Sequence, residues 1–247
     1  MTSGLSALPQ WWLPLNAAAH GASLDRHLLL NLWIATALLA LTHLLLLAGL
    51  ILRRGKRVRR TAALFEYVPV ALLTVLFAWL TLRAEGLWAE TRYTGANPAA
   101  MQVEVTGVQF AWYFRYPGSD AAFGRVRPEL VAPGEGNPLG IDPKDAKGAD
   151  DFVSSELVLP AGREVDLRLH AQDVIHGFSV PEMRIKQNAV PGQNFHLHVT
   201  PTRPGTYAIL CTQLCGLGHY RMGATLRVLD ETDYKKWLAS HEAAVTQ

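Results

Sequence analysis

The sequence predicts a membrane-anchored protein in which two transmembrane helices precede an exported all-β domain. Two long apolar segments lie within the first 85 residues and are separated by a run of basic residues. From residue 152 onward, short alternating segments are separated by turns, as in all-β domains. Hydrophobic residues make up 49% of the chain and charged residues only 18%, which is low for a purely soluble protein.

The first apolar segment, Leu28–Leu52, has 25 residues and no formally charged side chain. A helix of that length crosses a hydrocarbon core of about 30 Å. The segment Thr61–Leu82 predicts a second span. The six basic residues between the two spans predict a cytoplasmic loop: Arg53, Arg54, Lys56, Arg57, Arg59 and Arg60. Both termini are then expected outside, and the chain divides into a tail (1–26), a helical hairpin (27–85) and an exported domain (86–247).

The exported domain carries 15 Lys and Arg residues against 18 Asp and Glu residues, a net charge of −3. It has no basic surface of the kind that nucleic-acid binding requires. A mildly acidic surface instead suits a basic protein partner.

The domain begins with a segment rich in β-branched and aromatic residues, Val103–Tyr116, which predicts a strand. Residues 119–151 are rich in Gly, Pro and Asp and predict a long loop. Loops of this length are usually functional or disordered. Docking against a partner subunit is one interpretation of this loop.

Five short strands are predicted after the loop: Glu156–Leu159, Glu164–His170, Phe195–Thr200, Thr206–Leu210 and Ala224–Leu229. Apolar and polar residues alternate along two of them, so His170, His196 and His198 are expected on a solvated face and not as metal ligands. Asp230 is expected to cap a final helix that continues to Ala239, with Trp237 packing on the sheet.

A short Gly-containing stretch gathers two thiols, an imidazole and a thioether: Cys211, Cys215, His219 and Met222. Sulfur and imidazole donors together suit copper better than Mg²⁺ or Ca²⁺. His176 lies upstream, where the fold could bring it in. Two simpler interpretations remain open for the thiols, which are a disulfide or a zinc site formed with the two histidines.

The complete pattern, Cys-x3-Cys-Gly-x2-His-x2-Met with Asp-x2-His-x-Phe upstream, resembles the binuclear copper (CuA) loop of subunit II of the haem-copper cytochrome c oxidases. The resemblance implies a cupredoxin-like Greek-key β-barrel behind the two membrane helices. It also implies bridging thiolates from Cys211 and Cys215, one copper completed by His176 and Met222, and the other by His219 and the backbone carbonyl of Gln213.

The resemblance extends to residues around the site, with some departures. Asp173 stands three residues before His176 and is expected to orient it. The family usually has a Trp, thought to receive the incoming electron, where this chain has Phe110. Trp112 or Tyr113 are therefore alternative acceptors. Many relatives carry Glu, a Mg²⁺ ligand, at the position of Gln213, so no Mg²⁺ ligand is expected here.

The implied function is electron transfer in a respiratory, proton-translocating cytochrome c oxidase. The domain would accept electrons from a c-type cytochrome and pass them to haem in subunit I, with subunit III as a further partner. The implied location is the bacterial inner membrane, with the N-terminus and the C-terminal domain on the periplasmic side. Two alternatives are a quinol-oxidising relative, a class that lacks the copper ligands kept here, and a membrane-anchored copper delivery protein.

Overall fold

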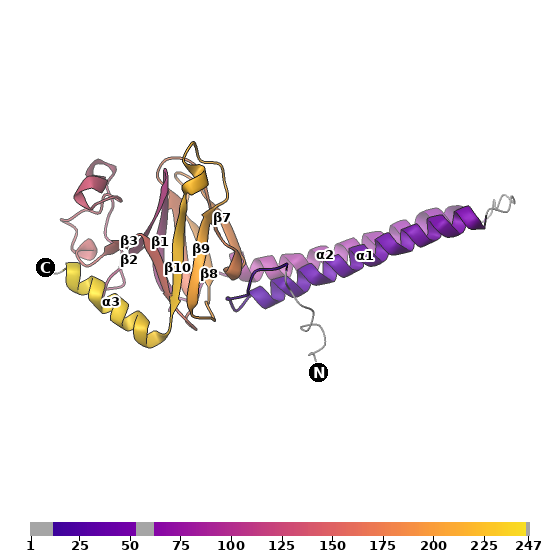
Figure 1. Ribbon diagram of the computed structural model, residues 1–247, viewed down its shortest axis with the longest axis horizontal. Helices are drawn as coiled ribbons and strands as arrows, with labels where there is room; N and C mark the ends of the chain where they lie inside the picture. The colour runs from indigo at the N-terminus through magenta and orange to yellow at the C-terminus, as the bar shows by residue number, and fades with distance from the viewer. Residues whose placement is uncertain (1–11, 53–61, 246–247) are drawn as a thin grey trace. The chain divides into compact units, whose positions relative to one another are not determined.

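The computed structural model describes residues 12–52 and 62–245 (Figure 1). Two compact parts are distinguished within these residues. One contains residues 12–21 and 94–245, and the other contains residues 22–52 and 62–93.

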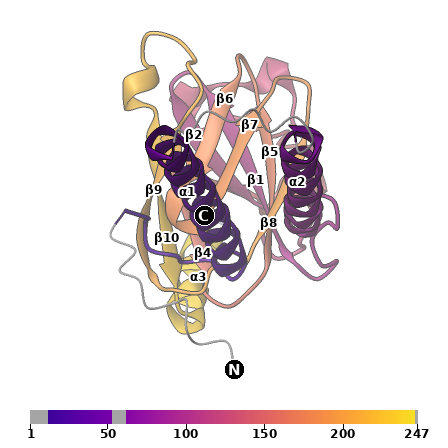
Figure 2. The same cartoon turned by 90° about the vertical axis from the view of Figure 1, so that its right-hand side faces the viewer.

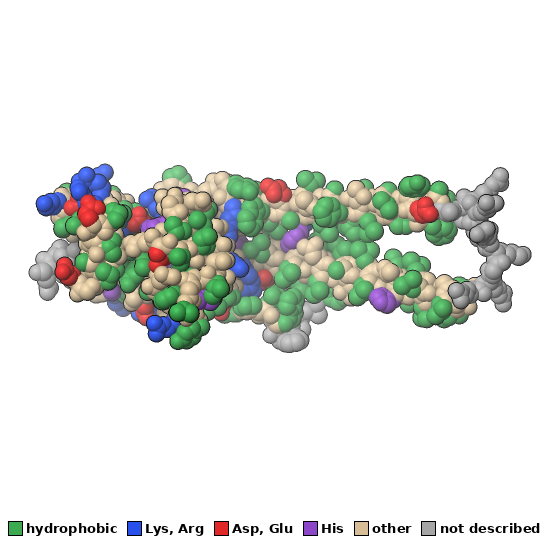
Figure 3. All heavy atoms as spheres, turned by 90° about the horizontal axis from the view of Figure 1, so that it is seen from above, with side chains coloured by type: hydrophobic (Ala, Val, Ile, Leu, Met, Phe, Trp, Pro, Cys, Tyr) green, Lys and Arg blue, Asp and Glu red, His purple; other side chains and the backbone are tan. Residues whose placement is uncertain are grey.

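The second part is a pair of long helices, α1 (Gly21–Ile51) and α2 (Ala62–Arg92), of 31 residues each. At 1.5 Å per residue each helix is about 46 Å long, more than a bilayer core requires. Hydrophobic side chains run along both helices (Figure 3). The predicted pair of spanning helices is thus confirmed as two apolar helices, with α2 continuing ten residues beyond Leu82. The basic run that predicts their orientation, 53–60, lies outside the described residues.

The first part is a β-sandwich of two five-stranded sheets (Figures 1 and 2). The first sheet has the order β3 (Phe152–Ser154), β2 (Ala111–Tyr116), β1 (Met101–Val108), β5 (Val165–Ala171), β8 (Phe195–Val199). The second has the order β4 (Glu156–Pro160), β10 (Gly223–Leu229), β9 (Gly205–Cys211), β6 (His176–Val180), β7 (Ile185–Ala189). Pairs β1/β5 and β4/β10 are parallel and the other pairs are antiparallel.

The core lies between the two sheets. Each sheet turns alternate apolar residues inward, and Val105, Leu167, Phe178, Ile209 and Leu226 are all almost completely buried. The predicted all-β domain behind two helices is therefore confirmed.

The prediction of one strand over Val103–Tyr116 is wrong. The segment forms a hairpin, in which Val108 of β1 pairs with Ala111 of β2 across a two-residue turn at Gln109 and Phe110. This turn contains neither Gly nor Pro, so the sequence carries no turn signal there.

Three short strands were not predicted: β3, β6 and β7. All five residues of β6 are buried, so the strand lacks the alternation that identifies a half-buried strand. The five predicted strands correspond to β4, β5, β8, β9 and β10 within one or two residues.

The last helix, α3 (Glu231–Val245), begins as expected, because the carboxylate of Asp230 accepts a hydrogen bond of 2.9 Å from the backbone N–H of Asp233. It continues beyond the expected end at Ala239. Trp237 packs edge-on against Tyr116 and Phe152, with ring centroids 5.1 and 5.7 Å apart. The predicted packing of Trp237 on the sheet is thus confirmed.

A segment that precedes α1, residues 12–20, packs on the β-domain, which was not predicted. Ala17 and Ala18 are buried there. Ala17 donates a hydrogen bond to the carbonyl of Glu182 and accepts one from Thr202, while Ala19 donates to the carbonyl of Thr200. We call residues 12–20 the N-terminal strap.

The prediction for the three strand histidines is only partly right. The side chain of His196 is 55% exposed and bonds to Asp166 at 2.8 Å, as a surface pair would. His170 is half-buried and bonds to Thr106 at 3.0 Å. The long loop 119–151 lies over this face of the sheet, and its residues line one pocket with His170.

Candidate metal centre

The predicted ligands lie in the connection between β9 and β10, which forms the gold loop at the top of Figure 1. Cys211 ends β9, His219 begins a single 3-10 turn, and Met222 directly precedes β10. The N–H of Cys211 donates to the carbonyl of Met222 at 3.2 Å, which closes the loop at its base.

The pairing of β6 with β9 brings His176 to this loop. Phe178 lies opposite Cys211, so His176, at the start of β6, is level with the residues that follow Cys211. The N–H of Thr212 donates to the carbonyl of Gly177 at 2.8 Å. A Cβ at Gly177 would lie 2.6 Å from the Thr212 hydroxyl oxygen, so only glycine allows this approach.

The donor atoms of the predicted ligands converge. The two thiol sulfurs are 3.8 Å apart, and ligand atoms of His176, Cys211 and Cys215 all lie within 4.8 Å of one another. The Cys215 sulfur is 3.6 Å from His219 Nδ1 and 3.6 Å from the Met222 sulfur. The Gln213 carbonyl oxygen is 3.2 Å from the Cys211 sulfur. His219, Met222 and the Gln213 carbonyl therefore adjoin the group of three, each beside one of the two sulfurs.

Asp173 orients His176, as predicted from its spacing. Its carboxylate accepts a hydrogen bond of 2.8 Å from His176 Nε2 and another from the N–H of Gln109. Burial alone would raise the pKa of Asp173, but the hydrogen bonds from His176, Gln109 and Val174 lower it below its usual range. An ionised Asp173 favours the proton on Nε2, which leaves the lone pair of Nδ1 available.

That Nδ1 atom of His176 is fully buried and has no hydrogen-bond partner within residues 12–52 and 62–245. A buried unpartnered polar atom is costly unless something binds it. A metal ion beside the thiols would satisfy it, so the residues present fit a metal.

The protein environment disfavours the thiolate form of Cys215. Burial, followed by the neighbouring Cys211, raises the pKa of Cys215 to about 11. Both cysteines are free thiols in this structure, and their separation of 3.8 Å is far longer than a disulfide bond. Because only a bound cation would favour two adjacent thiolates, the pair suits metal binding coupled to proton release.

The donor set also bears on the zinc interpretation. Met222 is buried with its sulfur against Cys215, and thioethers are uncommon ligands of structural zinc. Two thiols, a thioether and imidazoles form a soft set that suits copper.

The turn between β1 and β2 covers the loop. A Cβ at Gly218 would lie 2.4 Å from Cδ2 of Phe110, so the ring of Phe110 rests directly on this glycine. The side-chain amide of Gln109 donates to the carbonyl of Cys215 at 2.6 Å. Gln109 therefore links Asp173 to the cysteine loop, a role that sequence reasoning missed because no local pattern marks it.

The three candidate electron acceptors lie in different environments. Trp112 is 2% exposed and meets the ring of His176 edge-on, with centroids 5.8 Å apart. Phe110 and Tyr113 are both partly exposed. Of the three, Trp112 contacts a predicted ligand but does not reach the surface.

Residues 101–229, more than half of the chain, match the family described as the periplasmic domain of cytochrome c oxidase subunit II. The alternative cytochrome c oxidase subunit 2 of Bradyrhizobium diazoefficiens is 34% identical over 241 residues, covering 93% of this chain and 83% of that protein. The chain belongs to the cytochrome c oxidase subunit II family.

Other relatives in this family are more distant. Cytochrome c oxidase subunit 2 of Synechocystis is 30% identical, covering 66% of this chain and 40% of that protein. The protein of the same name in Cereibacter sphaeroides is 30% identical, covering 57% and 49%. The chain thus spans less than half the length of these two relatives. The solved periplasmic domain of cytochrome oxidase subunit II of Bradyrhizobium japonicum superposes with a TM-score of 0.45 at 21% identity, covering 61% of this chain and 99% of that domain.

Family membership decides between the classes considered from the sequence. The chain is an electron-transfer subunit of a terminal oxidase, and neither the quinol-oxidising nor the copper-delivery alternative is favoured. The cluster of His176, Cys211 and Cys215 and the two apolar helices fit a membrane-anchored member of this family.

Proposed function

We propose that this chain holds a binuclear copper centre that receives electrons from a c-type cytochrome and delivers them to haem in subunit I of its oxidase. Cys211 and Cys215 would contact both ions. His176 and Met222 would complete one site, and His219 with the Gln213 carbonyl the other. The observation that carries the proposal is the cluster of His176, Cys211 and Cys215, whose ligand atoms lie within 4.8 Å of one another. His176 Nδ1 is buried there and has no hydrogen-bond partner among the described residues.

A copper pair joined by two thiolates exchanges one electron with little change in geometry, which suits rapid transfer. The protein contributes rigidity to such a site. The strands β6 and β9 carry His176 and Cys211. Asp173 orients the ring of His176, and Gln109 holds the loop at the carbonyl of Cys215. Preorganised ligands reduce the rearrangement that accompanies a change of charge.

The surface around the loop is suited to docking. Leu214, Leu217 and Tyr220 project from it with exposed fractions of 76, 98 and 85%. Exposed apolar groups of this kind mark protein interaction sites. We place the contact with the c-type cytochrome here, where a partner would reach Phe110 and the ligand loop, with the mildly acidic domain favouring a basic donor.

Trp112 would act inside the domain. It is too deeply buried to meet a partner, but its contact with His176 places an aromatic ring against a ligand. Electrons would therefore enter by way of Phe110 and the loop, with Tyr113 as the other partly exposed ring.

We further propose that the chain lies in the bacterial inner membrane as a multi-pass subunit, with the β-domain periplasmic and subunits I and III as neighbours. Support comes from the basic run between the helices and from the strap. Residues 12–21 belong to the same compact unit as the β-domain, which supports a topology in which the two ends of the helical hairpin would share one side of the membrane.

The test is the metal content and spectrum of the purified oxidase. Two copper ions per chain at this centre, with electron-spin hyperfine splitting from two equivalent nuclei, are expected. The variant Cys211→Ser should lose this signal while the oxidase still assembles. A single copper ion, zinc alone or a Cys211–Cys215 disulfide in the active enzyme would contradict the proposal.

A further inference from the structure

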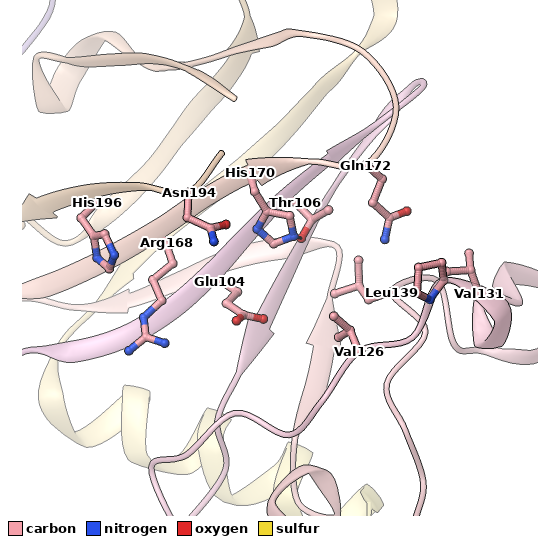
Figure 4. Close-up of a pocket in the computed structure, with 11 residues that line it drawn as sticks. Glu104, Thr106, Val126, Val131, Leu139, Arg168, His170, Gln172, Asn194 and His196 are labelled. Carbon is pink, nitrogen blue, oxygen red and sulfur yellow. Dashed lines mark hydrogen bonds between the residues drawn. The ribbon is translucent and has the colours of Figure 1, made fainter. Parts of the chain in front are cut away.

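A cleft of about 900 Å³ lies on the outer face of the first sheet (Figure 4), and none of the six proposed metal ligands lines it. The strands β1, β5 and the stretch leading into β8 provide a polar wall, and the long loop 119–151 provides an apolar one. We call it the loop cleft. Its lining residues are Glu104, Thr106, Arg168, His170, Gln172, Asn194 and His196 from the sheet side, and Val126, Pro128, Val131 and Leu139 from the loop.

The loop wall is held in place by a buried ion cluster. Arg115 is 1% exposed and pairs with Glu104 at 3.0 Å and with the fully buried carboxylate of Asp151. It also donates to the carbonyl of Gly124 at 2.6 Å. Phe123 is contacted by the guanidinium groups of Arg115 and Arg168, each 5.2 Å from its ring centroid. Arg115 of the first sheet therefore holds both ends of the loop in place.

The middle of the loop is held together by its own hydrogen bonds. Asn137 makes two hydrogen bonds with the backbone of Ile141, at 2.8 and 2.9 Å. The buried Asp142 accepts from Arg127 at 2.8 Å, and hydrogen bonds from the Lys144 N–H and Arg127 lower its pKa despite some burial. The cleft is therefore formed before any ligand binds, as ligand sites usually are.

The charges around the cleft are balanced. Glu104 and Asp151 share Arg115, and Arg168 supplies a second positive charge beside Phe123, so these two carboxylates and two guanidinium groups carry no net charge. Burial is the largest influence on His170 and lowers its pKa, although Glu104 opposes this, so the ring is neutral near pH 7. A strongly anionic or cationic ligand would find no matching excess of charge here.

The groups that remain available are neutral donors and acceptors. The exposed amide side chains of Gln172 and Asn194 have no hydrogen-bond partner among the described residues. In Figure 4 both point into the cleft, on either side of His170. Opposite them, Val126 and Val131 are 50 and 38% exposed. Amides that face apolar side chains match a peptide, whose backbone alternates donors and acceptors and whose side chains can be apolar.

We propose that the loop cleft binds an extended, uncharged peptide segment of a neighbouring oxidase subunit, with an apolar side chain against Val126 and Val131. The inference rests on the chain working within an oxidase complex, but it does not need copper. It assigns a role to a 33-residue loop that electron transfer leaves unexplained.

The test is photo-crosslinking in the whole oxidase isolated from membranes. A benzophenone amino acid replaces Val131 at the rim of the cleft, with Val126 as a second position in case bulk at Val131 disturbs the loop. Lys147 is the control, because it is exposed on the same loop but does not line the cleft. The expected result is an adduct from Val131 or Val126 to one uncharged segment of another subunit, and none from Lys147.

Adding Gln172→Ala and Asn194→Ala should lower the adduct yield at least fivefold, about the effect of one lost hydrogen bond. An adduct with lipid or another small amphiphile only, no adduct at either position, or an equal adduct from Lys147 would overturn the proposal. Copper content measured on the same preparation separates the two proposals, since a copper-free complex with the expected adduct contradicts only the first.

Discussion

At the scale of single residues, Asp173 determines which nitrogen of His176 faces the thiols. Asp173→Asn removes the charge that holds the proton on Nε2, while leaving the size of the side chain unchanged. Loss of such an outer partner typically lowers metal affinity by about 10- to 100-fold. We expect a loss of this size, measured by competition with a copper chelator.

A matched control exists in the same domain. Asp166 and His196 form a pair of the same length, 2.8 Å, on the outer face of the first sheet. Asp166→Asn should leave copper affinity unchanged. If both variants lose copper equally, Asp173 acts through general stability and not through His176.

Gly218 tests the contact between the turn and the cysteine loop. Its Cβ would overlap Phe110, so Gly218→Ala forces one of them to move. Overpacking of this kind costs about 1–3 kcal/mol. The copper affinity measured by competition with a chelator should therefore fall roughly tenfold. Phe110→Ala in the same chain should restore copper retention by making room.

The control for the added methyl group is Gly134→Ala, where nothing lies within 4 Å of the new Cβ. Gly134→Ala should retain copper against the chelator as well as the unsubstituted protein does. Failure of Phe110→Ala to rescue Gly218→Ala would mean that the contact with Phe110 does not account for the loss of copper.

At the scale of elements, the buried Arg115 joins the long loop to the hairpin of β1 and β2. Arg115→Met leaves Asp151 without its cation, and breaking a buried pair in this way costs about 3–5 kcal/mol. For a domain of this size the melting temperature should fall by roughly 6–20 °C, measured on the purified chain in detergent.

The exposed pair of Arg227 and Glu156 provides the comparison. Its side chains are 40 and 45% exposed and 3.3 Å apart, so Arg227→Met should cost less than about 1 kcal/mol. Equal effects of the two substitutions would show that Arg115 does not anchor the loop.

The elements also show how far sequence reasoning reaches. The ligand loop was predictable because its donors are local, and the helices because their apolar runs are long. The strand β6 could not be predicted, because burial on both faces removes the alternation of apolar and polar residues. The partial burial of His170 beneath the loop 119–151 could not be predicted, because the loop is held there by the contact of Arg115 with Asp151, 36 residues away. Local patterns identify local chemistry, whereas contacts made by distant segments do not appear in them.

At the scale of the whole molecule, the β-domain holds the chain both before α1 and after α2. The strap contributes the buried Ala17 and Ala18 and backbone hydrogen bonds to Glu182, Thr200 and Thr202. The chain is therefore attached to the β-domain on both sides of the helical hairpin, and the strap is the attachment that precedes α1.

This account predicts different outcomes for neighbouring positions in the strap. Ala17→Asp buries a charge without a partner and should detach the strap, since an unpaired buried charge is strongly unfavourable. Ala19 is exposed, so Ala19→Asp should leave the strap in place. Limited proteolysis of the purified oxidase should cut Ala17→Asp within residues 12–20 and spare Ala19→Asp. Because the proposed metal ligands lie elsewhere, Ala17→Asp should retain any copper bound there. A strap that stays protected in this variant would show that the second attachment does not depend on Ala17.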